Sequence, residues 1–234
     1  MAFSHEQIIS SNNNCICILF LGFISHKYQI TEPIVIFVKS SLNIEYKNPS
    51  EYHINDRMTF FREFNPSGDI AFVGDSLTEG ANWGQIFPAS RIANFGIGGN
   101  TLKNIVGMTD LIVKSGARKA FVMAGVNDLS MMKYSVESAV DNYKKLINSL
   151  VNNDISVFLQ STIKTRDSII NKKIEVLNIS MKEFCESEGK CTWFDVNETM
   201  TSDGLLSSDY TTDGTHLNGA GYRAWSSVIA TKLN

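Results

Sequence analysis

The apolar positions of the chain follow two different periods from about residue 51 onward. Five short apolar runs, each bounded by glycine or polar residues, have the length and composition of buried β-strands. They are DIAFVG (69–74), RIANFG (91–96), KAFVMAG (119–125), ISVFLQS (155–161) and CTWFDV (191–196). The sequence therefore predicts five strands in this part of the chain.

Three other segments repeat apolar residues every three or four positions, which is the period of one helix face. The first stripe runs from Val136 to Leu150, and Ser135 precedes it as a candidate N-cap. The second comprises Ile170, Ile174, Leu177, Met181 and Phe184, and the third comprises Tyr222, Trp225, Val228 and Ile229. We interpret all three stripes as faces that pack on a core.

Strands that alternate with helices predict a parallel sheet that is covered by helices on both faces. The fold class is therefore α/β, with one domain spanning residues 51–234. In open sheets of this kind, ligands bind beyond the carboxyl ends of the strands. Functional side chains are expected at that edge, or in the loop before the last helix.

Residues 1–50 do not continue this pattern, and we treat them as an N-terminal leader or extension. The run CICILFLGFI (15–24) is too short to cross a bilayer as a helix but has the length of a signal-peptide core. However, no Lys or Arg occurs in residues 1–14, and no A-x-A-like cleavage site follows the run. An export signal, a membrane-associating segment and a disordered leader stay open, as do cytoplasmic and exported locations.

The composition is typical of a soluble globular protein, with 43% hydrophobic and 19% charged residues among 234. A net charge of −3 provides no basic field for a nucleic-acid partner. The histidines at positions 5, 26 and 53 lack metal-ligand spacing, and no H-E-x-x-H motif occurs, so no metal is implied. A dinucleotide fingerprint and a P-loop are also absent from the sequence, so no other cofactor is implied. Cys185 and Cys191 lie close enough in the sequence to pair across a short loop in an oxidising compartment, but we expect free thiols.

Candidate chemistry begins at VGDSLTEG (73–80), where Ser76 follows the first predicted strand. Gly-Asp-Ser alone is common turn chemistry, because Asp and Ser side chains bond nearby backbone amides. Three further fragments occupy the same edge of the predicted sheet or the loop before the last helix. They are NFGIGGNT (94–101) with Gly98 and Gly99, GVND (125–128) with Asn127, and DGTHLN (213–218) with Asp213 and His216.

These residue types together suit nucleophilic catalysis. A serine hydroxyl needs an adjacent base, and His216 has the intrinsic pKa for that task. Asp213, three residues earlier, is suited to fix the imidazole tautomer and to stabilise the imidazolium. The tetrahedral intermediate carries an oxyanion, for which the N–H of Ser76, the N–H of Gly99 and the amide of Asn127 are candidate donors.

The four fragments, in this order, resemble the conserved blocks of the GDSL, or SGNH, hydrolases. The resemblance covers residues 51–234 and implies a flavodoxin-like three-layer α/β/α fold. It also implies Ser76 as nucleophile, Gly99 and Asn127 as oxyanion donors, and Asp213 with His216 as the rest of a triad. Two features depart from the family pattern: Gly98 stands where many members carry serine, and STIKTRD (161–167) stands where relatives often have a proline-containing loop.

The resemblance implies a serine esterase that acts on a small-molecule carboxylic ester. The flanks YHINDRMTFFREF (52–64) and GYRAW (221–225) are similar to those of acetylesterase and lysophospholipase-like members. We therefore expect removal of acetyl groups from a carbohydrate such as sialic acid. Trp83 is a candidate to stack on a sugar ring, with packing against the sheet as the other interpretation. A lysophospholipase or thioesterase, a carbohydrate O-acetyltransferase and a binding module without turnover are the alternatives.

Overall fold

The computed structural model of the protein describes residues 49–233. The chain divides into two units, Met1–Asn48 and Pro49–Asn234, and the second contains every predicted site residue. The apolar run 15–24 lies outside the described residues. Across residues 49–233, the structure contains no helix with the length and hydropathy needed to cross a membrane.

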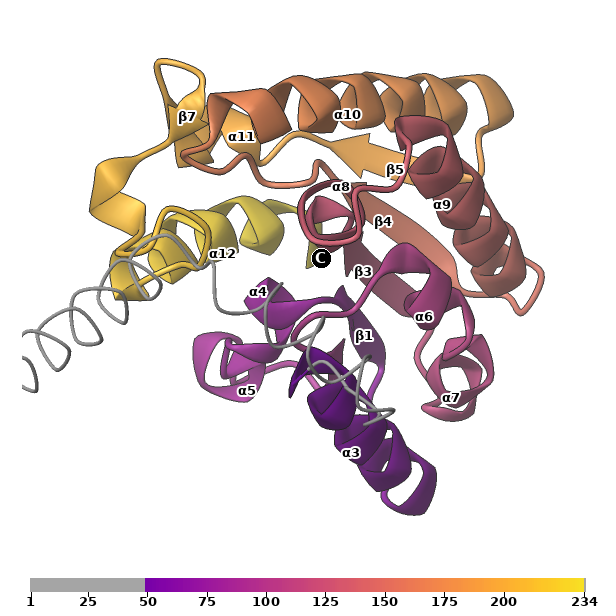
Figure 1. The fold of residues 1–234 in the computed structure, drawn as a ribbon. Helices are drawn as coiled ribbons and strands as arrows, with labels where there is room; N and C mark the ends of the chain where they lie inside the picture. The colour runs from indigo at the N-terminus through magenta and orange to yellow at the C-terminus, as the bar shows by residue number, and fades with distance from the viewer. Residues whose placement is uncertain (1–48, 234) are drawn as a thin grey trace, which may run out of the picture. The chain divides into compact units, whose positions relative to one another are not determined.

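A parallel five-stranded sheet forms the centre of the second unit (Figure 1). Its strands are β1 (Ile70–Gly74), β2 (Ile92–Gly96), β3 (Lys119–Met123), β4 (Ser156–Gln160) and β5 (Cys191–Phe194), in the order β2-β1-β3-β4-β5. All five predicted strands are confirmed. Gly74 at the end of β1 is in register with Gly96 of β2 and Met123 of β3. The loops that follow these three strands therefore emerge side by side at one edge.

Helices cover the sheet on both faces. They are α3 (Pro49–Glu63), α4 (Ser76–Glu79), α5 (Trp83–Ile86), α6 (Leu102–Val106), α7 (Thr109–Lys114), α8 (Val126–Ser130), α9 (Val136–Val151), α10 (Ser168–Glu188), α11 (Asn197–Met200) and α12 (Gly219–Leu233). Strand side chains alternate between two buried clusters: Ala71 and Val73 of β1 belong to one, Ile70 and Phe72 to the other. The predicted three-layer α/β/α fold is confirmed.

The three predicted helical stripes correspond to α9, α10 and α12. Ser135 caps α9 as expected, because its Oγ accepts the backbone N–H of Ser138 at 3.2 Å. The apolar pattern did not predict α3, whose Phe61 is buried while Phe60 and Phe64 are exposed. It also did not predict the short antiparallel pair β6 (Thr201–Ser202) and β7 (Leu205–Leu206).

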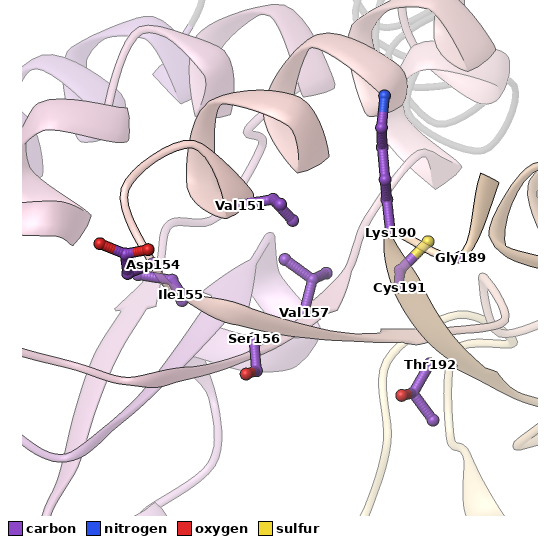
Figure 2. A pocket seen from close by; sticks show the side chains of 9 residues that line it. All are labelled: Val151, Asp154, Ile155, Ser156, Val157, Gly189, Lys190, Cys191 and Thr192. Atoms are coloured by element: carbon purple, nitrogen blue, oxygen red, sulfur yellow. The ribbon is translucent and has the colours of Figure 1, made fainter.

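Cys185 and Cys191 form a disulfide, which corrects the expectation of free thiols. Gly189 ends α10 with a φ of +62° and donates its N–H to the carbonyl of Cys185 at 3.0 Å. This left-handed turn reverses the chain directly into β5, which brings the two Cα atoms within 4.9 Å. Cys191 also lines a hollow of about 470 Å³ with Val151 and Thr192, at the amino ends of β4 and β5 (Figure 2). The hollow therefore lies at the edge of the sheet opposite the predicted site.

Candidate active site

Ser76 is held on a tight turn at the carboxyl end of β1. The preceding Asp75 caps α4, because its Oδ1 accepts the N–H of Leu77 at 3.0 Å. A Cβ at position 74 would collide with the carbonyl oxygen of Met123, so the turn requires glycine at that position. Since Ser76 is the first residue of α4, its N–H has no acceptor within the helix.

Ser76, His216 and Asp213 form a continuous chain of polar contacts. Ser76 Oγ lies 3.0 Å from His216 Nε2, and His216 Nδ1 lies 2.6 Å from Asp213 Oδ2. The other oxygen, Oδ1, accepts the backbone N–H groups of Thr215 and His216 at 2.8 and 2.7 Å. A carboxylate held in this way places a proton on Nδ1 and leaves the Nε2 lone pair directed at the serine hydroxyl. The arrangement can therefore accept a proton from Ser76.

The electrostatic environment keeps Asp213 ionised. Burial acts to raise the pKa of this carboxyl, but the hydrogen bonds from the His216 side chain and from the backbone N–H groups of Thr215 and His216, together with the charge of His216, lower it well below its ordinary value. An ionised Asp213 is the form that stabilises a positively charged imidazole. The loop 213–216 thus carries both an imidazole that can accept a proton and the carboxylate that supports it electrostatically.

Two further predicted residues, Gly99 and Asn127, lie in the segments that follow β2 and β3. Ile97, which follows β2, donates its N–H to the carbonyl of Gly74 at 3.3 Å, so the loop with Gly99 runs next to the nucleophile turn. Asn127 lies in α8, directly after β3, and its Nδ2 donates to the carbonyl of Asn100 at 2.9 Å. An amide carries two N–H groups, so this bond leaves a second one that is able to face a ligand.

Gly99 adopts a φ of +77°, in the left-handed region that favours glycine. A Cβ at this position would lie 2.9 Å from Cβ of Ser50, which belongs to the first turn of α3. The loop 97–101 is therefore packed closely against α3, and a larger residue at position 99 would meet both backbone strain and a steric clash.

Two buried carboxyl groups flank the site. Asp75 is fully buried, and desolvation raises its pKa to about 7 although the hydrogen bond from Leu77 opposes the shift. Asp128, also fully buried, accepts the N–H of Leu102 through both oxygens, at 3.2 and 3.0 Å. Desolvation raises the pKa of Asp128 to about 6. Sequence reasoning assigned neither residue a role, because a single sequence does not show which carboxyl groups become buried.

The position of Trp83 corrects the expectation that it stacks on a sugar ring. Its side chain is only 2% exposed, and its ring stacks on Phe72 at 4.2 Å and meets Trp225 edge-on at 5.1 Å. The indole Nε1 donates to the carbonyl of Thr78 at 2.9 Å. Trp83 therefore belongs to the core beneath the nucleophile helix and offers no ring face to a substrate.

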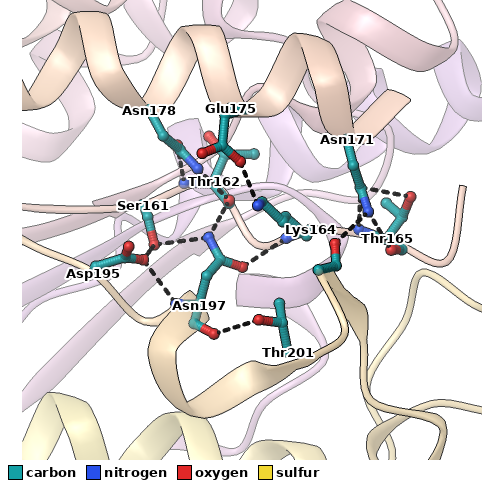
Figure 3. A network of polar contacts seen from close by, with 11 residues as sticks. Ser161, Thr162, Lys164, Thr165, Asn171, Glu175, Asn178, Asp195, Asn197 and Thr201 are labelled. Carbon is teal, nitrogen blue, oxygen red and sulfur yellow. Dashed lines mark hydrogen bonds and ion pairs between the residues drawn. The ribbon is translucent and has the colours of Figure 1, made fainter. Parts of the chain in front are cut away.

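The loop after β4, STIKTRD (161–167), is fixed by three asparagine amides (Figure 3). Asn178 bonds the N–H and the carbonyl of Thr162, and Asn197 bonds the carbonyl of Thr162 and the N–H of Lys164. Asn171 similarly bonds the N–H and the carbonyl of Thr165. Arg166 then donates its N–H to the carbonyl of Gly214, at 2.8 Å. The side-chain amides thus hold this loop in place, and through Arg166 the loop supports the 213–216 loop.

No group of three or more His, Cys, Asp or Glu side chains within residues 49–233 is arranged to hold a metal ion.

Residues 72–224 match the GDSL-like Lipase/Acylhydrolase family, and the chain belongs to this family. An N-acylneuraminate cytidylyltransferase from Streptococcus agalactiae serotype V is 31% identical over 159 residues, which are 67% of this chain and 37% of that protein. The chain thus spans little more than a third of the length of this relative.

Two solved structures show the same fold. One, from Streptococcus pneumonia and provisionally described as a platelet activating factor, has a TM-score of 0.73 and 25% identity, covering 78% of this chain and 94% of the other. The other, a catalytic mutant of Axe2, an acetylxylan esterase from Geobacillus stearothermophilus, has a TM-score of 0.60 and 16% identity, covering 71% and 94%. The predicted family is confirmed, and its description as lipases and acylhydrolases agrees with the predicted class of carboxylic ester hydrolase.

Proposed function

We propose that the protein is a serine esterase that removes O-acetyl groups from a carbohydrate, with O-acetylated sialic acid as its substrate. The observation that carries the proposal is the contact chain from Ser76 Oγ to His216 Nε2 at 3.0 Å and from His216 Nδ1 to Asp213 Oδ2 at 2.6 Å. This is the geometry that an activated serine nucleophile requires.

The reaction proceeds in two steps through an acetyl-enzyme. Ser76 Oγ attacks the acetyl carbonyl carbon while its proton passes to His216 Nε2, and the same proton then goes to the sugar oxygen as the ester bond breaks. Water attacks the acetyl-serine in the second step, with His216 again taking and returning a proton, and acetate leaves. The N–H groups of Ser76 and Gly99 and the amide of Asn127 stabilise the oxyanion in both steps.

Two observations support an acetylated sugar as substrate. The curated relative is named for N-acylneuraminate, which is a sialic acid, and it contains a segment similar to this chain. Among the proteins of the same fold, Axe2 is named as an acetylxylan esterase, and another, from Talaromyces cellulolyticus, as a member of carbohydrate esterase family 3.

The segments beside the nucleophile favour a short acyl group. The chain after Ser76 continues into the short helices α4 and α5, and Trp83 of α5 is packed in the core. The chain after β3 likewise enters the short helix α8. These segments contribute helices to the fold rather than a long apolar flap, and a small acyl pocket rejects longer chains by overpacking.

The test is a series of p-nitrophenyl esters from acetate to dodecanoate, assayed with O-acetylated sialic acid, acetylated xylan and lysophosphatidylcholine. We expect the highest kcat/KM on acetate, a steep fall by butyrate or hexanoate, and acetate release from O-acetylated sialic acid. In a pocket adapted to lipids, each additional buried methylene group of the acyl chain would instead improve the binding free energy by about 0.8 kcal/mol. Peak activity on octanoate or longer esters, or on lysophosphatidylcholine, would overturn the proposal in favour of the lipase-like alternative. Faster acetyl transfer to an added sugar than to water would show a transferase.

A further inference from the structure

Glu79, the last residue of α4, joins three segments at the edge of the candidate site. Its Oε2 accepts the backbone N–H of Gly98 at 2.7 Å and lies 2.8 Å from His53 Nε2. Its Oε1 forms an ion pair with Arg57 Nε at 3.0 Å. The side chain is 24% exposed, so these partners fix a carboxylate that is largely withdrawn from solvent. One glutamate thus connects the nucleophile helix, the loop 97–101 and α3.

Side chains bind the backbone one residue before and one residue after Gly99. Glu79 binds the N–H of Gly98, and Asn127 Nδ2 binds the carbonyl of Asn100. Further along, Asp128 binds the N–H of Leu102. The carbonyl of Ile97, in the same peptide group as the Gly98 N–H, accepts the N–H of Asn100 at 3.1 Å, which closes a turn with Gly98 and Gly99 at its centre. Holding this turn in place leaves little freedom for the direction of the Gly99 N–H, which lies in its central planar peptide group. Of these side chains, Glu79 is the one that belongs to α4, the helix that begins at Ser76.

The close packing around Gly98 shows that the loop and the carboxylate are fitted to each other. A Cβ at position 98 would lie 3.1 Å from Glu79 Oε2 and 3.4 Å from His53 Cδ2. Glycine at this position therefore allows the carboxylate to approach the backbone, and a side chain there would press against it.

We propose that Glu79 is a positioning residue, which sets the direction of the Gly99 N–H toward the oxyanion, and that His53 and Arg57 of α3 hold its carboxylate in place. This inference rests on the proposed esterase function. Electrostatic stabilisation depends on donors that are aligned before the reaction, so a misplaced donor lowers the rate of the chemical step. The first helix of the described unit thereby acts on catalysis through Glu79.

The test compares Glu79→Ala and Glu79→Gln with Glu188→Ala, a control that removes a surface glutamate paired with Lys190. Active sites are counted by fluorophosphonate labelling of Ser76, and kcat per labelled site is measured with p-nitrophenyl acetate. We expect Glu79→Ala to lower kcat per site by about 10- to 100-fold, below the full loss of an oxyanion donor, with KM within about twofold. Glu79→Gln keeps an oxygen that accepts the Gly98 N–H, so it should retain kcat within about threefold.

A purely structural role would lower the number of labelled sites and leave kcat per site unchanged, and that result would overturn the inference. An equal loss in Glu79→Gln and Glu79→Ala would also contradict it. Should Glu79→Ala not fold, the double variant His53→Ala/Arg57→Ala leaves Glu79 in place without its two partners. It should lower kcat per site and slow the labelling of Ser76, and unchanged values would exclude the role of α3. Turnover that survives Ser76→Ala would instead refute the proposed function, independently of Glu79.

Discussion

Ser76 Oγ lies 3.0 Å from Nε2 of His216, although 140 positions separate the two residues in the sequence. Ser76 follows β1, which lies between β2 and β3 in the sheet, and His216 precedes the last helix, α12. The parallel sheet brings the carboxyl ends of its strands to one edge, and α12 packs so that the loop before it reaches the same edge. The order of the strands and helices therefore brings Ser76 and His216 into contact. Substitutions at these two residues are the most direct tests of the proposed mechanism.

Replacing Ser76 with alanine should abolish turnover of p-nitrophenyl acetate. The nucleophile is lost, and only the roughly 10³–10⁴-fold acceleration that the oxyanion donors and binding provide should survive. The measurement is kcat on purified protein, with Ser130→Ala as a control for serine replacement away from the triad. Activity in Ser76→Ala equal to wild type, in a preparation free of other esterases, would refute the mechanism.

His216→Ala should be nearly as damaging as Ser76→Ala, and the double variant should be little worse than either single one. The serine and the imidazole act as one unit, so removing the second partner costs little once the first is gone. Asp213→Ala should also lower kcat strongly, because it removes the carboxylate that orients the imidazole. The three variants and the double variant are compared at one pH. Losses that multiply would indicate a base other than His216.

Asn127→Ala should lower kcat by about 10²–10³-fold, the usual effect of removing one oxyanion donor. The loss should fall on kcat rather than on KM, because the donor acts on charge that develops in the transition state. Asn153→Ala, at an exposed asparagine beyond α9, provides the matched control. A variant that raises only KM would show that Asn127 binds the ground state instead.

The strands, the helices α9, α10 and α12, and the proximity of Ser76, His216 and Asp213 could be predicted because each rests on a local signal. The spacing of apolar residues in short runs and in helical stripes predicts which positions are buried. The edge of a parallel sheet then narrows the positions at which Ser76, Asp213 and His216 can meet. Their proximity was therefore expected from the fold class, whereas their triad roles were implied by the family resemblance.

The remaining features depend on tertiary contacts that leave no local pattern. The exposed Phe60 and Phe64 obscure the buried face of α3, so neither that helix nor the His53–Glu79 contact was predicted. A tryptophan near a nucleophile has the same sequence signature whether it faces solvent or, as Trp83 does, the core. The disulfide depends on the left-handed turn at Gly189, which the sequence alone does not specify.

Asp75 has an unusual environment for the residue that precedes a nucleophile. Its carboxyl is fully buried, Oδ1 accepts the Leu77 N–H, and Oδ2 has no hydrogen-bond partner within the described residues. Desolvation and, to a smaller extent, the nearby charge of Asp128 raise its pKa, while the Leu77 hydrogen bond and His216 lower it, and the net result is a pKa of about 7. The folded protein therefore keeps a proton on Asp75 at pH values where the unfolded chain has released it.

This proton makes stability depend on pH in a defined direction. The stabilising contribution is complete below the ordinary aspartate pKa of 3.8 and is lost as the pH rises to about 7, so the free energy of unfolding should fall across this range. Asp128, with a pKa of about 6, changes the free energy of unfolding mainly below pH 6. The change in stability between pH 6 and 7 should therefore report on Asp75.

Asp75→Asn cannot ionise, so its urea midpoint should fall less than that of wild type between pH 6 and 7.5. Asp69→Asn, at an exposed carboxylate, should keep the wild-type slope. If Asp75→Asn keeps that slope as well, Asp75 does not hold a proton in the folded protein near neutral pH.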